Sequence, residues 1–149
     1  MASAVIDDHI LRDILAGQRP RDLGGVAAGG IATTGLWLFR LCSSLADPTV
    51  AGRLSAPVAD LPAPVQALFR SQLVTLPDDI EVLSLRDLSW SMAELQQHHR
   101  NEGRNLSALM VEALAAAHLL EADIAVSKLD VGPNLRAAAK ADGIGFHAL

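Results

Sequence analysis

The chain has 149 residues and a formal net charge of −5, and half of its residues are apolar. This size and composition exclude disorder and predict one domain, spanning residues 1–149, with a single sizeable core. Residues 1–75 balance six acids with six arginines, while the rest carries eleven acids against six basic side chains. No basic stripe is present and only five residues are aromatic, two Trp and three Phe. This pattern does not support RNA binding, but it does not exclude a nuclease.

The apolar pattern predicts neither a membrane span nor a secreted protein. The longest uncharged stretch, Leu23 to Phe39, contains five Gly and two Thr, and is interpreted as a buried turn followed by a helix. The first residues contain no basic segment and bring in acids at Asp7, unlike a signal peptide. The single cysteine, Cys42, permits no internal disulfide. These features favour a cytoplasmic protein.

Strands and helices are predicted to alternate along the chain. In the first half, residues 4–6 form a strand, Asp7 or Asp8 caps a helix over 9–16, and further helices cover 34–45 and 65–73, separated by an irregular, proline-containing connection over 47–64. In the second half the expected elements are a strand (80–85), helices (87–99 and 106–120, the latter capped by Asn105 or Ser107), a strand (124–127), a helix (133–141) and a strand (144–149). This alternation predicts a three-layer α/β/α fold with a parallel central sheet of about four to five short strands.

Four carboxylates stand out as candidate site residues. Asp7 and Asp8 follow the first strand, Asp130 follows the strand at 124–127, and Glu112 is a lone acid in an apolar helix. Ligands of parallel α/β sheets bind at the carboxyl ends of the strands, where converging carboxylates can hold Mg²⁺ or Mn²⁺. Ordinary roles remain open for each: a helix cap for Asp7 or Asp8, an exposed helix edge for Glu112, and a turn for Asp130.

The order of these segments resembles the PIN domain family, in particular the small single-domain toxins of toxin–antitoxin pairs. The similarity covers the opening Ala4-Val5-Ile6-Asp7-Asp8, the strand at 80–85 with the helix after it, the helix containing Leu106-Ser107-Ala108-Leu109, and the segment from Ile124 to Asp130. It implies a PIN-like fold with a metal-dependent ribonuclease site of three or four carboxylates. Asp7 would be the first acid and Asp130 the last, and Met110 or Glu112 would occupy the third position.

The chain departs from this family pattern at the second acidic position. Arg40 falls there, and a cation at that place repels a metal and can pair with Asp7. The leading hypothesis is therefore a degenerate PIN-like domain that acts through protein or ligand binding. The alternative is an active Mg²⁺- or Mn²⁺-dependent endoribonuclease using Asp7, Glu112 and Asp130 as catalytic and metal-binding residues. In a third hypothesis Arg40, with Asp8 beside it, binds a phosphate or carboxylate ligand.

The resemblance also implies partners. Small PIN-like proteins are commonly homodimers, and a toxin-like ancestry implies an antitoxin-like protein partner. The high apolar content agrees with a dimer, and Trp37 and Phe39 are not expected to point into the same core if their helix is half buried.

Overall fold

The computed structural model describes residues 3–47, 49 and 52–149 of the chain. Its centre is one sheet of five parallel strands, in the order β3-β2-β1-β4-β5. The strands are β1 (Ala4–Ile6), β2 (Ile31–Thr34), β3 (Ile80–Leu83), β4 (Asp123–Val126) and β5 (Phe146–Ala148). The predicted parallel α/β fold is thus confirmed.

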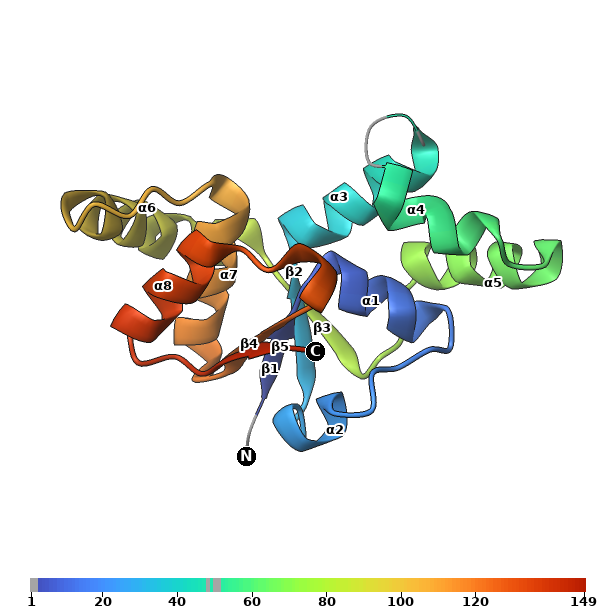
Figure 1. Ribbon diagram of the computed structural model, residues 1–149, viewed down its shortest axis with the longest axis horizontal. Helices are drawn as coiled ribbons and strands as arrows, with labels where there is room; N and C mark the ends of the chain where they lie inside the picture. The colour runs from blue at the N-terminus through green and yellow to red at the C-terminus, as the bar shows by residue number, and fades with distance from the viewer. Residues whose placement is uncertain (1–2, 48, 50–51) are drawn as a thin grey trace.

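Helices cover both faces of the sheet, which gives three layers (Figure 1). One core cluster gathers residues of α6 (Leu85–Asn101), α7 (Ala108–Leu120) and α8 (Pro133–Ala141), together with Val5 and Ile124 of the sheet. The second cluster lies on the opposite face and gathers residues of α1 (Asp8–Leu15), α2 (Leu23–Val26), α4 (Gly52–Ala59) and α5 (Ala63–Val74). Side chains of β1 alternate between the two, because Ala4 and Ile6 join the second cluster and Val5 joins the first.

Helix α3 (Gly35–Ala46) connects the two helical layers. Its Trp37 belongs to the first core cluster and its Leu41 to the second, and the helix contacts α1, α4 and α7. It starts directly after β2, where Thr34 caps it by accepting a hydrogen bond from the Trp37 backbone NH at 3.3 Å. The first turn of α3 therefore lies at the carboxyl edge of the sheet.

The strand order reverses direction between β1 and β4. From β1 the chain moves outward through β2 to β3, and then returns to the other side of β1 for β4 and β5. Such a topological switch point leaves a crevice at the carboxyl ends of the two central strands, because the connections that follow them turn to opposite faces. Residues after β1 and β4 meet there.

Two sequence expectations were wrong. The uncharged stretch before α3 contains the strand β2, which was interpreted as a turn because Thr33 and Thr34 are polar. Both threonines are buried, and the Thr33 hydroxyl donates a hydrogen bond to the Ile6 carbonyl at 2.9 Å. The proline-containing connection contains the helix α4 with Pro57 inside it. Its Leu54 and Val58 lie one turn apart and are both buried, so packing against the core outweighs the unfavourable proline.

The other strands and helices that the sequence predicted agree with the structure to within a few residues. Asp7 caps α1 and Ser107 caps α7, each accepting a backbone hydrogen bond from the residue three positions on. Helix α7 is buried from Val111 through Ala117, as its nearly continuous apolar sequence indicates. Within the described part of the chain, no helix combines the length and the apolarity needed to cross a membrane.

Candidate functional site

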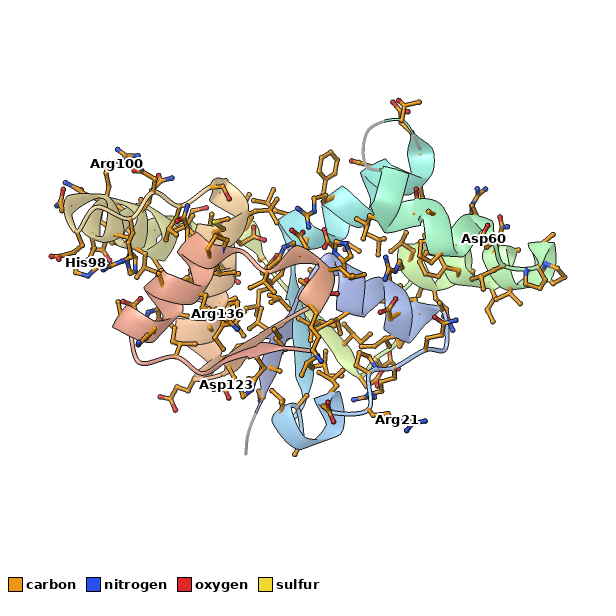
Figure 2. All side chains as sticks on the ribbon, in the orientation of Figure 1. Arg21, Asp60, His98, Arg100, Asp123 and Arg136 are labelled. Atoms are coloured by element: carbon orange, nitrogen blue, oxygen red, sulfur yellow. The ribbon has the colours of Figure 1, made fainter. Side chains whose placement is uncertain are left out.

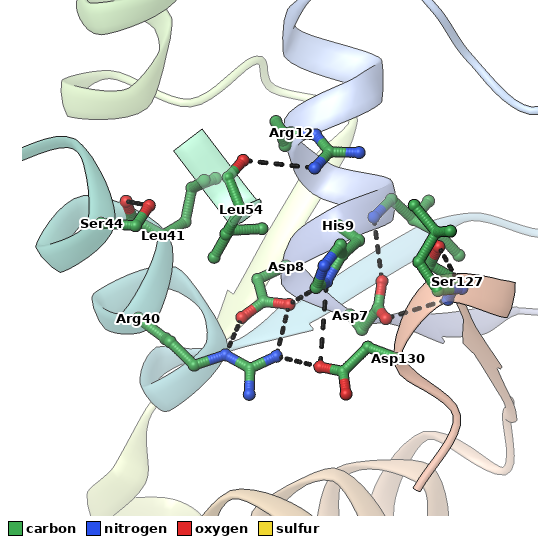
Figure 3. Close-up of polar contacts among 12 residues, drawn as sticks. Asp7, Asp8, His9, Arg12, Arg40, Leu41, Ser44, Leu54, Ser127 and Asp130 are labelled. Atoms are coloured by element: carbon green, nitrogen blue, oxygen red, sulfur yellow. Dashed lines mark hydrogen bonds and ion pairs between the residues drawn. The ribbon is translucent and has the colours of Figure 1, made fainter. Parts of the chain in front are cut away.

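The polar cluster at the switch point is built from three segments distant in sequence. Asp7 and Asp8 come directly after β1, Asp130 ends the short 3₁₀ helix (Lys128–Asp130) that follows β4, and Arg40 comes from α3 (Figure 3). The structure therefore brings together four of the five residues singled out in the sequence. Glu112 takes part in none of the hydrogen bonds or ion pairs among these four.

Asp7 connects α1 to the end of β4 through two hydrogen bonds. Its Oδ1 accepts the Ile10 backbone NH and its Oδ2 accepts the Ser127 backbone NH, each at 2.9 Å. The residue is only 2% exposed. Burial raises the pKa of Asp7 from 3.8 to about 6, against the lowering effect of these two hydrogen bonds. Both carboxylate oxygens of Asp7 therefore already accept hydrogen bonds from backbone NH groups.

Arg40 bridges Asp8 and Asp130. Its Nε donates to Asp8 Oδ2, and its Nη2 donates to Asp8 Oδ1 at 2.9 Å and to Asp130 Oδ2 at 2.6 Å. The expected pairing of Arg40 with Asp7 was wrong, because Asp7 faces the backbone while the fully buried Asp8 presents both of its oxygens to the guanidinium. The fork of arginine fits a carboxylate in this bidentate way.

The pKa values of this pair move apart. The pKa of Asp8 is lowered: burial raises it, but hydrogen bonds from His9 and Arg40 and the positive charge of Arg40 outweigh that effect. The hydrogen bond to Asp8 raises the pKa of Arg40 above its ordinary value. Both groups are therefore ionised at neutral pH, and the pair is a stable ion pair.

His9 is a member of the cluster that the sequence did not reveal. Its Nδ1 lies 3.0 Å from Asp8 Oδ1 and 3.9 Å from Asp130 Oδ2. The pKa of His9 is raised: burial lowers it, but the hydrogen bond to Asp8 and the nearby carboxylates outweigh this. The sequence indicated His9 only through its position after two aspartates at a helix start. A single histidine in such a position does not by itself indicate a site.

Glu112 is buried in the core rather than placed on an exposed edge of its helix. It has no solvent exposure, and its Oε1 accepts the Leu36 backbone NH in the first turn of α3 at 2.9 Å. A carboxylate at a helix N-terminus compensates unpaired NH groups and the helix dipole. Its Oε2 has no hydrogen-bond partner among the described residues. Glu112 therefore positions α3, the helix that carries Arg40.

A cavity of about 90 Å³ opens beside the ion pairs. Asp7, Arg40 and Asp130 form its polar side, and its apolar wall includes Trp37, Met110 and Leu135. Of the two candidates for the third acidic position, Met110 lines this cavity and Glu112 does not.

Two apolar side chains are exposed next to the cluster residues. Phe39, adjacent to Arg40 in sequence, is 67% exposed, and Leu129, adjacent to Asp130, is 79% exposed. Trp37 is buried, so the expectation that Trp37 and Phe39 do not share one core is confirmed. We refer to Phe39 and Leu129 as the apolar rim.

The donor set fits a catalytic divalent metal poorly. One ligand atom from each of Asp7, Asp8 and His9 lies within 4.8 Å of the others, which is close enough for a metal. However, both oxygens of Asp7 accept backbone NH groups and both oxygens of Asp8 accept from Arg40. A divalent ion needs several hard oxygen ligands, and here the guanidinium already compensates their charge.

The fold and cluster define a doubly wound parallel α/β domain with an arginine–carboxylate network at its switch point. No protein family model matches the chain, and no curated protein sequence matches it.

Proposed function

We propose that this protein is a PIN-like domain of toxin–antitoxin type ancestry whose acidic site holds an arginine where the family holds a metal, and that it acts by binding a partner rather than by cleaving RNA. The observation that carries the proposal is the bridge from Arg40 to Asp8 and Asp130. This bridge joins the ends of β1 and β4, where the family resemblance implies metal ligands.

The electrostatic argument is direct. Two unit charges 4 Å apart interact by about 4 kcal/mol at an effective dielectric constant of about 20. A divalent cation placed beside Arg40 would be repelled by roughly twice that amount, and it would have to displace the guanidinium from a fully buried carboxylate. Metal binding at Asp8 therefore requires loss of the ion pair.

The apolar rim supports binding of a protein partner. Phe39 and Leu129 are exposed apolar side chains whose sequence neighbours Arg40 and Asp130 belong to the cluster, and large exposed apolar side chains are typical of the anchors of protein interfaces. The partner that the family resemblance implies first is a second copy of the chain, and an antitoxin-like protein is the second. Homodimerisation is tested by light scattering at micromolar concentration, where a monomeric mass would contradict it.

The alternative function is a Mg²⁺- or Mn²⁺-dependent endoribonuclease that uses Asp7, Glu112 and Asp130. The proximity of ligand atoms of Asp7, Asp8 and His9 favours it. The positions of Arg40 and Glu112 weigh against it.

Calorimetric titration with Mn²⁺ decides between the two. We expect no saturable binding that depends on Asp7 in the wild-type protein. We expect Arg40→Gln, which removes the cation but keeps an amide donor, to gain Mn²⁺ binding. Arg86→Gln, at an exposed arginine on α6, is the matched control and should behave as the wild type. Saturable wild-type binding that disappears in Asp7→Asn, with RNA cleavage that needs the metal, would overturn the proposal in favour of the nuclease.

A further inference from the structure

A second cavity, of about 440 Å³, lies between α8 and the segment that leads from α8 into β5. It is lined by two cationic side chains, two apolar side chains and the main chain of two glycines: Arg136, Lys140, Ile144, Phe146, Gly143 and Gly145. Figure 2 labels Arg136, which extends from α8. The residues of the switch-point cluster do not line this cavity, so it is a separate candidate site.

The two cations lie on one face of α8. Arg136 and Lys140 are four residues apart, so their Cβ atoms are about 5–6 Å from each other. Like charges at this spacing repel each other and modestly destabilise a helix. Neither side chain forms an ion pair with any residue that the structure describes. An anion bound between the two cations would offset their repulsion.

The end of the helix accounts for only one of these two cations. Lys140 lies in the last turn of α8, where a positive charge interacts favourably with the helix dipole. Arg136 lies one turn earlier and packs over the ring of Phe146, with its Cζ atom 5.4 Å from the ring centroid. This contact holds the guanidinium beside the cavity without pairing it with an acceptor oxygen. The NH groups of Arg136 are therefore available as donors to a ligand.

The acids next to the cavity residues belong to other pairs and do not line the cavity. Asp142 ends α8, but its Oδ2 lies 2.8 Å from Nε2 of His118 on α7. Asp123 lies behind Gly145, so close that a Cβ at Gly145 would clash with its carboxylate, and its Oδ2 lies 2.8 Å from His147 Nε2. The lining of the cavity is thus positively charged in a chain whose net charge is −5.

A phosphate monoester matches this lining. Its phosphate group is close to a dianion at neutral pH, since its second pKa is about 6, and two cations match a dianion better than the single charge of a carboxylate. Ile144 and Phe146 are partly buried and continue the cavity with apolar surface. The volume also falls within the range of about 300–1,000 Å³ that is typical of small-molecule sites.

We propose that Arg136 and Lys140 bind the phosphate group of a small phosphate monoester, whose organic part contacts Ile144 and Phe146. Arg136 donates directional hydrogen bonds from its planar guanidinium, and Lys140 adds a mobile point charge. This site is independent of the arginine–carboxylate network at the switch point.

The test is calorimetric titration of the full chain with phenyl phosphate at neutral pH, compared with inorganic phosphate and phenol. We expect saturable binding of one phenyl phosphate per chain, weaker binding of inorganic phosphate, and no binding of phenol over the same concentration range. Arg136→Gln and Lys140→Gln should each raise the dissociation constant at least about fivefold. Both side chains are exposed, so both variants should fold as the wild type does.

The matched control is Arg100→Gln. Arg100 is an exposed arginine in the last turn of α6 and does not line the cavity (Figure 2). We expect this variant to bind phenyl phosphate as the wild type does. Equal weakening in Arg100→Gln and Arg136→Gln would show a general attraction of anions to surface cations and would overturn the proposal.

Further outcomes would also contradict the site. Absence of phenyl phosphate binding in the wild type would overturn it, as would binding that is unchanged in both Arg136→Gln and Lys140→Gln. Binding lost in Arg40→Gln but retained in Arg136→Gln would place the anion at the switch point instead. Binding of a 5′-phosphorylated oligoribonucleotide without binding of phenyl phosphate would refute a small-molecule ligand.

Discussion

Arg40 reaches from α3 to Asp8 at the start of α1 and forms a bidentate ion pair whose two members differ sharply in exposure. The Asp8 side chain has no solvent exposure, whereas 36% of the Arg40 side chain is exposed. The buried carboxylate therefore depends on a cation that reaches it from the surface. This dependence makes the cluster sensitive to single substitutions.

Loss of the Arg40 guanidinium should destabilise the protein. Removing one partner of a buried ion pair costs about 3–5 kcal/mol, and the partial exposure of Arg40 reduces this to about 2–3 kcal/mol. We expect Arg40→Gln to lower the free energy of unfolding by this amount, measured by urea denaturation. Arg86→Gln should change it by less than about 0.5 kcal/mol.

A double-mutant cycle isolates the pair itself. Asp8→Asn in the Arg40→Gln background should cost less than Asp8→Asn in the wild type, because in that background it removes a carboxylate that has already lost its guanidinium partner and leaves no arginine unpaired. Additive effects of the two substitutions would show that the ion pair is not a stabilising unit.

Asp7 should give the stability curve a distinctive pH dependence. Below pH 3.8 its carboxyl is protonated in both states, and between about pH 4 and 6 only the unfolded chain loses the proton, since burial raises the folded pKa to about 6. The free energy of unfolding should therefore fall over this window by about 3 kcal/mol from this group. The contributions of Asp8 and Asp142, whose pKa values are lowered, lie at lower pH.

The control for this dependence is Asp7→Asn. The asparagine cannot titrate, so the decline between pH 4 and 6 should be reduced in urea denaturation experiments. It should also be less stable than the wild type at pH 4, because an amide supplies only one acceptor oxygen for the two backbone NH groups of Ile10 and Ser127. An unchanged slope in the variant would refute a raised pKa at Asp7.

Glu112 is predicted to be structural. Glu112→Gln keeps an acceptor for the Leu36 backbone NH, so we expect a change in unfolding free energy of about 1 kcal/mol or less. Glu112→Leu leaves that NH without a partner and should cost about 1–3 kcal/mol. If Glu112→Gln abolished an activity or a metal-binding signal without affecting stability, the structural role would be wrong.

The apolar rim should determine association. We expect Phe39→Glu to shift the mass measured by light scattering from dimer to monomer, because the new charge would be buried in the proposed interface. Val74→Glu, at an apolar residue of α5 that is 88% exposed, is the matched control and should leave the mass unchanged. A dimer that persists in Phe39→Glu would place the interface elsewhere.

Local signals in the sequence were sufficient for much of the fold. Asp7 and Ser107 precede apolar stripes and cap helices as expected, and the alternation of short apolar runs with helical spacing predicted a parallel sheet. Strand β2 escaped prediction because it is central and buried on both faces, so its sequence Ile31-Ala32-Thr33-Thr34 shows no alternation of apolar and polar residues. Helix α4 was not predicted because only its packing against the core offsets the unfavourable Pro57.

The candidate site was partly predictable for the same reason. Because parallel strands end at a common edge, the sequence alone indicated that Asp7, Asp8 and Asp130 would lie near each other. The carboxylate that Arg40 pairs with was decided by tertiary structure, since two adjacent aspartates at a helix start point in different directions. The sequence also did not predict the burial of Glu112, the inclusion of His9 in the cluster, or the contacts of His99 and His118 with Asp142 at the ends of three helices. Side-chain contacts across tens of residues depend on how helices pack and rotate against the sheet, and the order of residues along the chain does not fix that geometry.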